Sequence, residues 1–578
     1  MGQPRAGRGG VLAVRLVGAS ARAGAAADRP HDRRHGRPLN PTPARHVQGP
    51  RRAHHNAAMD LTERTAGVLL HVTSLPGPHG VGDFGPAAFH FVDWLAGCGQ
   101  TLWQWLPTTP VGPGDSPYQS VSAFAGSPLM VALEPLVAAG WLPAPALPPG
   151  GFDTRRVDFA WVSPWRLQHL RRAWAGFEAL ATPAERRAFE AWCREAANAA
   201  WLDDYALFMA LEAAHDGQPW WQWPAALARR EPVALAAARA AQAGDIGFWC
   251  FVQWQFDVQC TALKAYANAR GVRLLGDLPV FVAHHSADCW ARPDLYQLDE
   301  AFQPTVVAGV PPDAMAALGQ RWGNPMYHWQ RMAGEGWSWW TARLARLLRQ
   351  ADALRIDHFR GFAAYWEIPA ACEDARGGRW VRGPGRAPFD AIAAELGPLP
   401  VIAEDLGFIT PDVHALRQAL GYPGMKVLQF AFGGDAANDY LPHTYGPDAV
   451  VYTGTHDNTT TRGWWQEAPE PVRRFAGSYL ACSEADVHWA AMRAAFNSVA
   501  ALVIVPLQDV LGLDAGHRLN TPGTMGAPNW CWRFEWSMVG PEPGRVLGLL
   551  TAASGRGRFE LLGIGTPPPT AVASYNGA

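Results

Sequence analysis

The sequence has few or none of the features that mark several common protein classes. Its 49 basic residues include only two lysines, Lys264 and Lys426, and its eight cysteines form no CxxC pair. The scattered cysteines argue against a zinc ribbon or a disulfide framework, so we interpret them as reduced thiols of a cytoplasmic protein. No apolar run approaches the roughly 18–20 residues that a membrane span needs. A GxxxxGK[ST] phosphate loop is also absent.

Charge is distributed unevenly along the 578 residues. Residues 1–58 hold 11 arginines and two acids. The formal net charge of the whole chain is −2, so residues 59–578 carry a net charge of about −11. An acidic body argues against nucleic acid as a partner, because phosphate binding needs a basic face. This charge distribution is compatible with a neutral substrate.

The first 58 residues differ from the rest of the chain in composition. They are rich in Ala, Gly, Pro and Arg and have no hydrophobic periodicity, so we predict a disordered basic extension. An organelle transit peptide and a basic nucleic-acid arm are the competing interpretations, and initiation at Met59 is compatible with the arginine-rich coding bias. We predict a second disordered tail at 566–578.

Between these ends, short apolar runs alternate with amphipathic stretches, which is typical of βα units around a parallel sheet. The pattern predicts an α/β protein, a (β/α)8 TIM barrel spanning 59–565, with helical or irregular insertions at about 112–250, between strands two and three, and about 283–350, between strands three and four. Helices are predicted around Phe251–Ala265, before Gly271, and from Pro411, capped by Thr410, to Gly421. The eight strand candidates are 67–75, 101–111, 272–282, 353–361, 400–407, 426–433, 449–455 and 501–511.

Three carboxylates close strand candidates of this barrel. Asp357 follows strand four, Glu404 strand five and Asp457 strand seven, and the carboxyl ends of barrel strands form the active-site face. Arg355 shares a strand face with Asp357, so we expect its charge to keep Asp357 ionised. Desolvation should raise the pKa of Glu404, although Asp405 beside it is an alternative for the same role. Three acids at one rim suit the stabilisation of an oxocarbenium ion.

Two other groups of residues have competing interpretations. His71, His284, His285, His358 and His456 lie at or near strand ends, but without HxH or HExxH spacing they favour hydrogen bonding to a sugar over metal binding. The 28 tryptophans serve core packing for the most part, whereas Trp322 lies in a glycine-flanked segment suited to contact with a pyranose ring.

The sequence resembles glycoside hydrolase family 77, the 4-alpha-glucanotransferases of the amylomaltase or disproportionating type, over roughly residues 60–535. The motifs that carry the resemblance are HVTSLPG from His71, DSPYQSVSAFAG from Asp115, GDLPVFV from Gly276, GVPPD from Gly309, GQRWGNP from Gly319, RIDHFRG from Arg355, AEDLG from Ala403, GTHDN from Gly454 and NTPG from Asn520.

The resemblance implies transfer of 4-alpha-glucan segments between malto-oligosaccharides, or to glucose, by a retaining double displacement. It implies Asp357 as nucleophile, Glu404 as acid/base and Asp457 as transition-state stabiliser, with no metal and no organic cofactor. The implied substrate-binding residues are Arg355, His456, Asp277, Tyr118, Gln320 and Trp322. The implied partners are malto-oligosaccharides, glucose and other alpha-1,4-glucans, with neither nucleic acid nor a membrane.

The sequence departs from the family pattern at three places, of which the first lies on the acceptor side and the second in a secondary glucan site. Ala314-Met315 stands where several members have an aromatic pair, Pro113 where some have a Tyr, and His285 where Asp is usual. An alpha-glucan hydrolase with the same triad and a non-catalytic glucan-binding protein therefore stand as alternatives.

Overall fold

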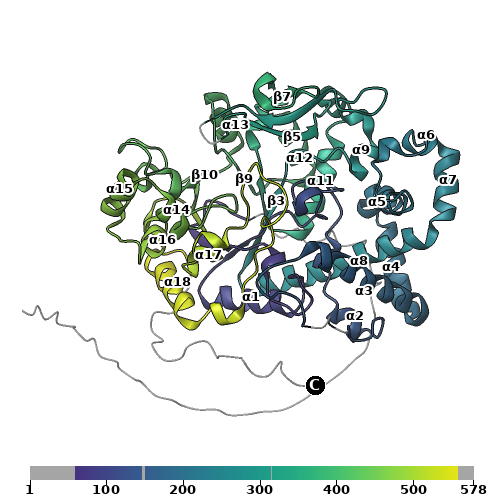
Figure 1. The fold of residues 1–578 in the computed structure, drawn as a ribbon, viewed down its shortest axis with the longest axis horizontal. Helices are drawn as coiled ribbons and strands as arrows, with labels where there is room; N and C mark the ends of the chain where they lie inside the picture. The colour runs from purple at the N-terminus through teal and green to yellow at the C-terminus, as the bar shows by residue number, and fades with distance from the viewer. Residues whose placement is uncertain (1–58, 146, 148–149, 314–315, 558–578) are drawn as a thin grey trace, which may run out of the picture. The chain divides into compact units, whose positions relative to one another are not determined.

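A closed barrel of eight parallel strands forms the centre of the fold (Figure 1). The computed structural model describes residues 59–145, 147, 150–313 and 316–557; the chain divides into two units, 1–56 and 57–578, and every described residue belongs to the second. The predicted extension 1–58, the tail 566–578 and Ala314-Met315 lie outside the described residues. In spatial order the strands are β1 (Thr65–Leu69), β12 (Leu502–Pro506), β11 (Ala449–Tyr452), β10 (Gly424–Val427), β9 (Val401–Ala403), β6 (Ala353–Ile356), β3 (Arg273–Leu278) and β2 (Leu102–Gln104).

All eight strand candidates contribute a barrel strand, which confirms the predicted fold. Each observed strand ends earlier than its candidate range, because the apolar run continues into buried turns and short helices. The clearest case follows β12, where α17 (Leu507–Val510) begins directly after Pro506. An apolar run alone cannot distinguish a strand from a buried helical turn.

The helices that surround the barrel agree with the hydrophobic periodicity. The predicted helix around residue 251 is part of α8 (Ala243–Ala269), and Gly271 then adopts φ +75°, which glycine tolerates without strain. Helix α13 (Pro411–Leu420) begins and ends as predicted, but the Thr410 side chain makes no capping hydrogen bond. The other helices on this layer are α1 (Pro86–Gly97), α11 (Ser338–Gln350), α12 (Ala387–Leu396), α14 (Thr461–Glu467), α15 (Glu470–Leu480), α16 (Val487–Asn497) and α18 (Pro541–Ala553).

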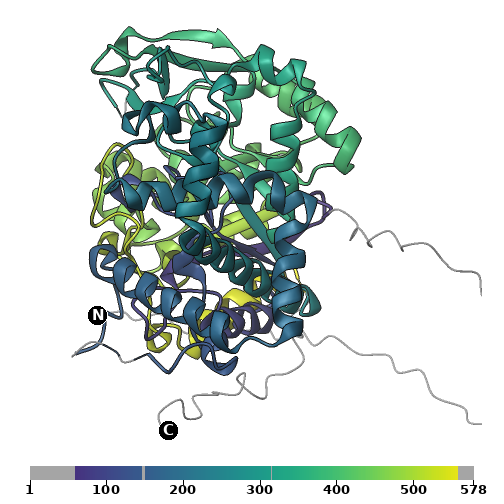
Figure 2. The ribbon, with the colours of Figure 1, turned by 90° about the vertical axis from the view of Figure 1, so that its right-hand side faces the viewer.

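The chain between β2 and α8 forms a helical insertion, whose blue helices face the viewer in Figure 2. Its two long helices are α3 (Phe159–Leu180) and α5 (Ala196–Ala214), and α5 packs against α8. The remaining helices are α2 (Glu134–Ala138), α4 (Pro183–Arg194), α6 (Ala225–Ala228) and α7 (Pro232–Ala241).

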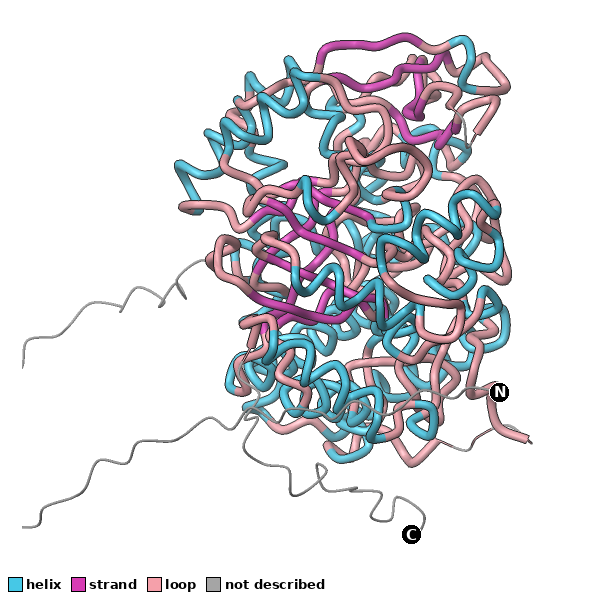
Figure 3. The backbone as a smooth tube through the Cα atoms, turned by 90° about the vertical axis from the view of Figure 1, so that its left-hand side faces the viewer, coloured by secondary structure: helices cyan, strands magenta, loops and turns pink. Residues whose placement is uncertain are grey.

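A second, four-stranded antiparallel sheet lies apart from the barrel strands, as Figure 3 shows in magenta. Its order is β5 (Gln320–Pro325), β4 (Val306–Val310), β7 (Ala364–Pro369) and β8 (Arg379–Arg382). The second insertion is therefore not only helical or irregular, since β4 and β5 fall within it, between the short helices α9 (Ala287–Ala291) and α10 (Trp329–Gly334). Glycines and prolines in these segments obscure the alternation that would reveal a strand.

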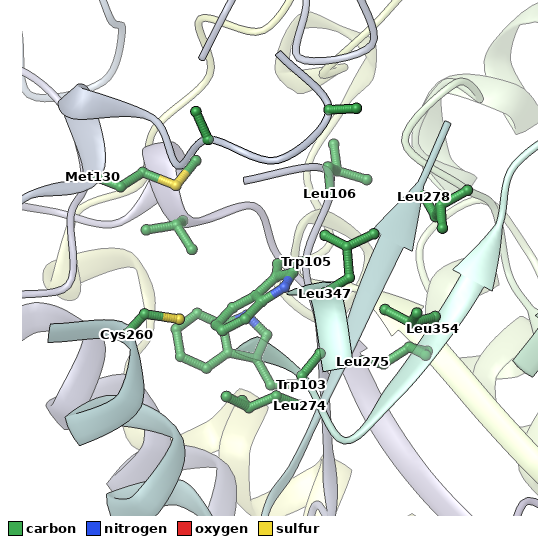
Figure 4. Packing of buried hydrophobic residues seen from close by; sticks show 14 of the residues in the cluster. Trp103, Trp105, Leu106, Met130, Cys260, Leu274, Leu275, Leu278, Leu347 and Leu354 are labelled. Atoms are coloured by element: carbon green, nitrogen blue, oxygen red, sulfur yellow. The ribbon is translucent and has the colours of Figure 1, made fainter. Parts of the chain in front are cut away.

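Large side chains pack between the barrel and its helices. Trp103 and Trp105 point from β2 and the residues after it toward α8, with ring centroids 5.4 Å apart, beside Cys260 and Leu274 (Figure 4). The Trp103 indole N–H donates to the Leu70 carbonyl at 2.8 Å, so its burial leaves no polar group unpaired. None of the described helices has both the length and the apolar character of a membrane span.

Candidate active site

Strands β6 and β9 place two of the predicted acids side by side. The strands pair with Ile356 opposite Ala403, and Asp357 and Glu404 are the next residues of each. The Asp357 backbone N–H donates to Leu278 and that of Glu404 to Ile356, so the ladder continues to the first residue of the mouth. The Asp357 side chain is 29% exposed, which leaves the carboxylate accessible to a ligand.

Arg355 joins Asp357 to Asp277 of the neighbouring strand β3. Its guanidinium donates to Asp357 Oδ1 at 2.9 Å and to both Asp277 oxygens at 2.9 and 2.7 Å. Arg355 and Asp277 are buried, with side-chain exposures of 5% and 0%. One cation therefore holds two carboxylates in fixed positions, and the second oxygen of Asp357 remains free of Arg355.

Arg355 favours the ionised form of Asp357, as expected, but burial outweighs it in the net shift of the pKa. Burial raises the pKa of Asp357 to about 6, and Asp277 and Asp457 add to the increase, although Arg355 opposes it. The sequence placed the cation correctly but did not reveal how far the barrel mouth shields the carboxylate from water. Asp357 is still predominantly ionised at neutral pH.

Burial also raises the pKa of Glu404, to about 8; Arg355 opposes the shift and Asp357 reinforces it. This agrees with the predicted desolvation. Its Oε2 accepts the His358 backbone N–H at 2.7 Å and its Oε1 accepts that of Leu406 at 3.0 Å. His358 has the left-handed φ of +51°, an unusual conformation for a side chain with Cβ, and this aims its N–H at Glu404.

Asp405 faces a different part of the structure from Glu404. Its carboxylate accepts the Met425 N–H at 2.7 Å and lies 3.2 Å from the Arg417 guanidinium, so it ties β10 to α13. Of the two neighbours, Glu404 is the one that interacts electrostatically with Asp357.

The loop after β11 brings Asp457 and His456 to the same mouth. Asp457 Oδ1 lies 3.4 Å from His456 Nε2 and accepts a hydrogen bond of 2.6 Å from the Asn520 amide. The Tyr118 hydroxyl donates to Asp277 at 2.8 Å and lies 3.0 Å from the same His456 nitrogen. Because the single Tyr118 proton is used on Asp277, His456 must donate its Nε2 proton to Tyr118. Burial lowers the pKa of His456, in keeping with a neutral ring.

Seven predicted residues thus belong to one connected group. Hydrogen bonds link His456, Tyr118, Asp277, Arg355 and Asp357, Asp457 lies 3.4 Å from the His456 ring, and Glu404 joins them through its electrostatic interactions. The residues come from the ends of β3, β6, β9 and β11 and from the loop after β2.

The two remaining predicted binding residues, Gln320 and Trp322, lie on β5 of the second sheet. The Trp322 indole N–H donates to Gln320 Oε1 at 3.1 Å, and its ring meets that of His358 edge-on with centroids 4.9 Å apart. Because His358 directly follows Asp357 in the chain, this ring contact joins β5 of the second sheet to the segment after β6.

Two residues that contact Asp457 had no role in the sequence prediction. Asn520 donates to its carboxylate and Arg518 to its backbone carbonyl. The NTPG motif that begins at Asn520 was the available signal, but its distance in sequence from Asp457 concealed the contact.

Two of the five histidines considered as metal ligands contact the insertions. His284 lies 2.7 Å from the Phe302 carbonyl, and His285 lies 2.9 Å from Glu212 of α5. Among the described residues, one group of metal-ligating side chains lies close together, and it consists of His79, Asp83 and Glu134.

Comparisons with known proteins agree with this geometry. The family model described as glycoside hydrolase family 77, 4-alpha-glucanotransferase, matches residues 70–538. A 4-alpha-glucanotransferase of Thermus thermophilus is 49% identical over 501 residues, covering 85% of this chain and 99% of that protein, and one of Synechocystis is 44% identical, covering 86% and 99%. The solved amylomaltase of Streptococcus agalactiae in complex with acarbose superimposes with a TM-score of 0.81 at 34% identity, covering 86% of this chain and all of that one.

Proposed function

The chain belongs to glycoside hydrolase family 77 and is a 4-alpha-glucanotransferase, and from that premise we propose how its residues perform the transfer. The reaction is a retaining double displacement that moves a 4-alpha-glucan segment from a malto-oligosaccharide to another malto-oligosaccharide or to glucose. Asp357 is the nucleophile, Glu404 the acid/base and Asp457 the transition-state stabiliser.

The observation that carries the proposal is the difference between two neighbouring carboxyl groups. A pKa of about 6 leaves Asp357 ionised at pH 7, whereas a pKa of about 8 leaves Glu404 protonated. Pairs of acids whose environments separate their pKa values in this way divide the roles of nucleophile and proton donor.

In the first step the Asp357 oxygen that Arg355 does not hold attacks the anomeric carbon. The bond from that carbon to the glycosidic oxygen breaks, and Glu404 protonates the departing oxygen. In the second step ionised Glu404 takes the proton from an acceptor 4-hydroxyl, which attacks the same carbon and releases Asp357. The product of the first step is a glycosyl group bound covalently to Asp357, and Asp457, held by Asn520, stabilises the positive charge that the sugar carries in the transition state of each step.

The remaining predicted residues bind and orient the substrate. Arg355 holds Asp357 by a hydrogen bond. Tyr118 donates a hydrogen bond to Asp277 in the same group, and His456 offers a neutral ring to a sugar hydroxyl. Gln320 and Trp322 flank the mouth from β5, where the indole presents a face to a glucose ring.

Two coarser assignments accompany this mechanism. We place the catalytic unit at 59–565, with its insertions at about 112–250 and 283–350, between a basic extension at 1–58 and a tail at 566–578. The eight cysteines are all free, which supports a reducing compartment such as the cytoplasm.

Pure maltotriose tests the proposed reaction. Transfer yields glucose together with oligomers longer than three units, whereas hydrolysis yields only glucose and maltose. A product profile with nothing longer than maltotriose would contradict the proposal and favour the hydrolase alternative.

A further inference from the structure

Two exposed aromatic side chains lie together beside the active site. Among the described residues, Trp161, Trp380 and Phe408 are the aromatic side chains that are both large and exposed. Phe408 is 66% exposed and Trp380 36% exposed, and their rings stack at 22° with centroids 6.4 Å apart. Exposing two adjacent aromatic rings to water is unfavourable, and such exposed apolar groups often mark a binding surface.

This pair is held rigidly from below. The Arg360 guanidinium carbon lies 3.7 Å from the centroid of the Trp380 ring, and the same guanidinium donates to the backbone carbonyls of Phe408 and Ala364. Trp366 of β7 packs edge-on against Trp380 across the strand pair β7–β8, at 5.2 Å. A fixed pair of rings loses little conformational freedom when a ligand binds.

The pair is attached on both sides to the carboxyl group of Glu404. Phe408 follows Glu404 by four residues in the loop after β9, and Leu406 between them donates to Glu404 Oε1. Arg360 follows His358 by two residues, and His358 donates to Glu404 Oε2. Arg360 also interacts electrostatically with Glu404.

Position relative to the acid decides which part of the substrate meets these rings. A group that protonates the glycosidic oxygen stands on the side of the departing segment, and the acceptor later enters by the same side. We propose that Trp380 and Phe408 form a platform for glucose rings of the acceptor glucan, beyond the ring that reacts. This inference rests on the proposed function, since it takes Glu404 to be the acid/base.

The platform predicts a dependence on acceptor length. An acceptor of one glucose unit reacts at the catalytic centre without reaching the platform, whereas a longer acceptor also packs its C–H faces on the two rings. Loss of one ring should therefore weaken the binding of long acceptors and leave the binding of a single glucose unit unchanged.

Phe408→Ala tests the platform, because a side chain this exposed contributes little to folding. Alpha-maltosyl fluoride at saturating concentration serves as donor, and methyl alpha-glucoside and methyl alpha-maltopentaoside serve as acceptors. We expect Phe408→Ala to raise the KM for the pentaoside by about 3- to 10-fold, the size of one aromatic contact, with kcat and the KM for the glucoside unchanged.

Two further variants complete the design. Phe408→Trp keeps a ring and should restore the wild-type KM, and Val233→Ala, which removes an exposed apolar side chain from α7, should change neither KM. An unchanged pentaoside KM in Phe408→Ala, or an equal rise for both acceptors, would overturn the platform. Failure of the wild-type protein to transfer maltosyl units to either acceptor would instead overturn the proposed function.

Discussion

The barrel mouth and the helix layer around α8 both bury carboxylates, but they balance the charge differently. In the helix layer Asp257 of α8 meets Arg346 of α11 at 2.6 Å, with side-chain exposures of 9% and 3%, and Asp83 meets Arg166 of α3 at 2.9 Å. At the mouth, Asp277, Asp357 and Glu404 surround Arg355, and Asp457 interacts electrostatically with Asp357. The helix layer neutralises its charges, whereas the acids of the mouth outnumber this cation, an excess that suits the cationic sugar of the proposed mechanism.

Replacing Asp357, the proposed nucleophile, should lower the rate of transfer more than any other substitution. We expect Asp357→Ala to lower transfer from maltotriose by at least about 10⁴-fold, since no other group can form the covalent intermediate. Glucan binding should persist, because the sugar contacts are spread over several loops. Transfer rates, together with trapping by an activated fluorinated maltosyl donor and mass spectrometry, check both points. Asp439→Asn, at an exposed position, is the matched control, and labelling of a different carboxylate in Asp357→Ala would refute the assigned nucleophile.

Replacing the proton donor should have the next largest effect. Glu404→Gln is expected to slow maltotriose transfer by about 10²- to 10⁴-fold. It should slow the first step with alpha-maltosyl fluoride much less, because fluoride departs without protonation. Single-turnover kinetics with the two donors measures this contrast. Equal losses with both donors would point to a structural role for Glu404.

The wild-type pH profile follows from the same two groups. Asp357 must be ionised, so kcat/KM should rise with pH through about 6, and Glu404 must be protonated, so kcat/KM should fall above about 8. Steady-state rates from pH 4 to pH 10 would show the bell, and Glu404→Gln should lose its alkaline limb. An alkaline limb that survives in Glu404→Gln must come from another residue.

Breaking a neutralised pair in the helix layer should affect stability rather than the chemistry. Arg346→Ala leaves Asp257 buried with the Trp192 indole N–H at 3.0 Å and the more distant Arg349 at 3.7 Å, and we expect a loss of about 3–5 kcal/mol in the free energy of unfolding. Arg194→Ala removes an equivalent arginine from the exposed pair with Glu190 and should cost less than about 1 kcal/mol. Urea titrations compare the two variants, and equal losses would show that burial does not separate them.

The smallest expected effect is a gain in stability at the mouth. Folded Glu404 keeps its proton to about pH 8, whereas an unfolded glutamate loses it near pH 4.5, so stability falls as pH rises across this window. Glu404→Gln removes this dependence, so its stability relative to wild type should be about 2–3 kcal/mol higher at pH 9 than at pH 6, at roughly 1.4 kcal/mol per pH unit up to the pKa of about 8. Thermal unfolding at the two pH values measures it, and a variant less stable than wild type by the same amount at both would contradict the argument.

Sequence patterns predicted the parts of the fold that depend on local order. Periodicity located all eight barrel strands and helices α8 and α13, and apolar strands ending in acids located the three carboxylates. The sheet β5-β4-β7-β8 was missed because its glycines and prolines obscure the alternation and because its central pair joins distant segments, with Gly309 of β4 opposite Trp366 of β7. The raised pKa of Asp357 depends on burial by the folded chain, which no local pattern contains. The contact of Asn520 with Asp457 joins residues far apart in the sequence, so no local pattern predicts it either.

The pairing of Ile356 with Ala403 has a stereochemical consequence. Hydrogen-bonded neighbours in a sheet lie about 4.7–4.9 Å apart, close to the roughly 5–5.5 Å between carboxyl groups that permits direct attack on the sugar. An acid two strands away would lie at about twice that spacing and leave room for water to invert the anomeric configuration. The order of the strands in this barrel therefore supports the retaining mechanism proposed above.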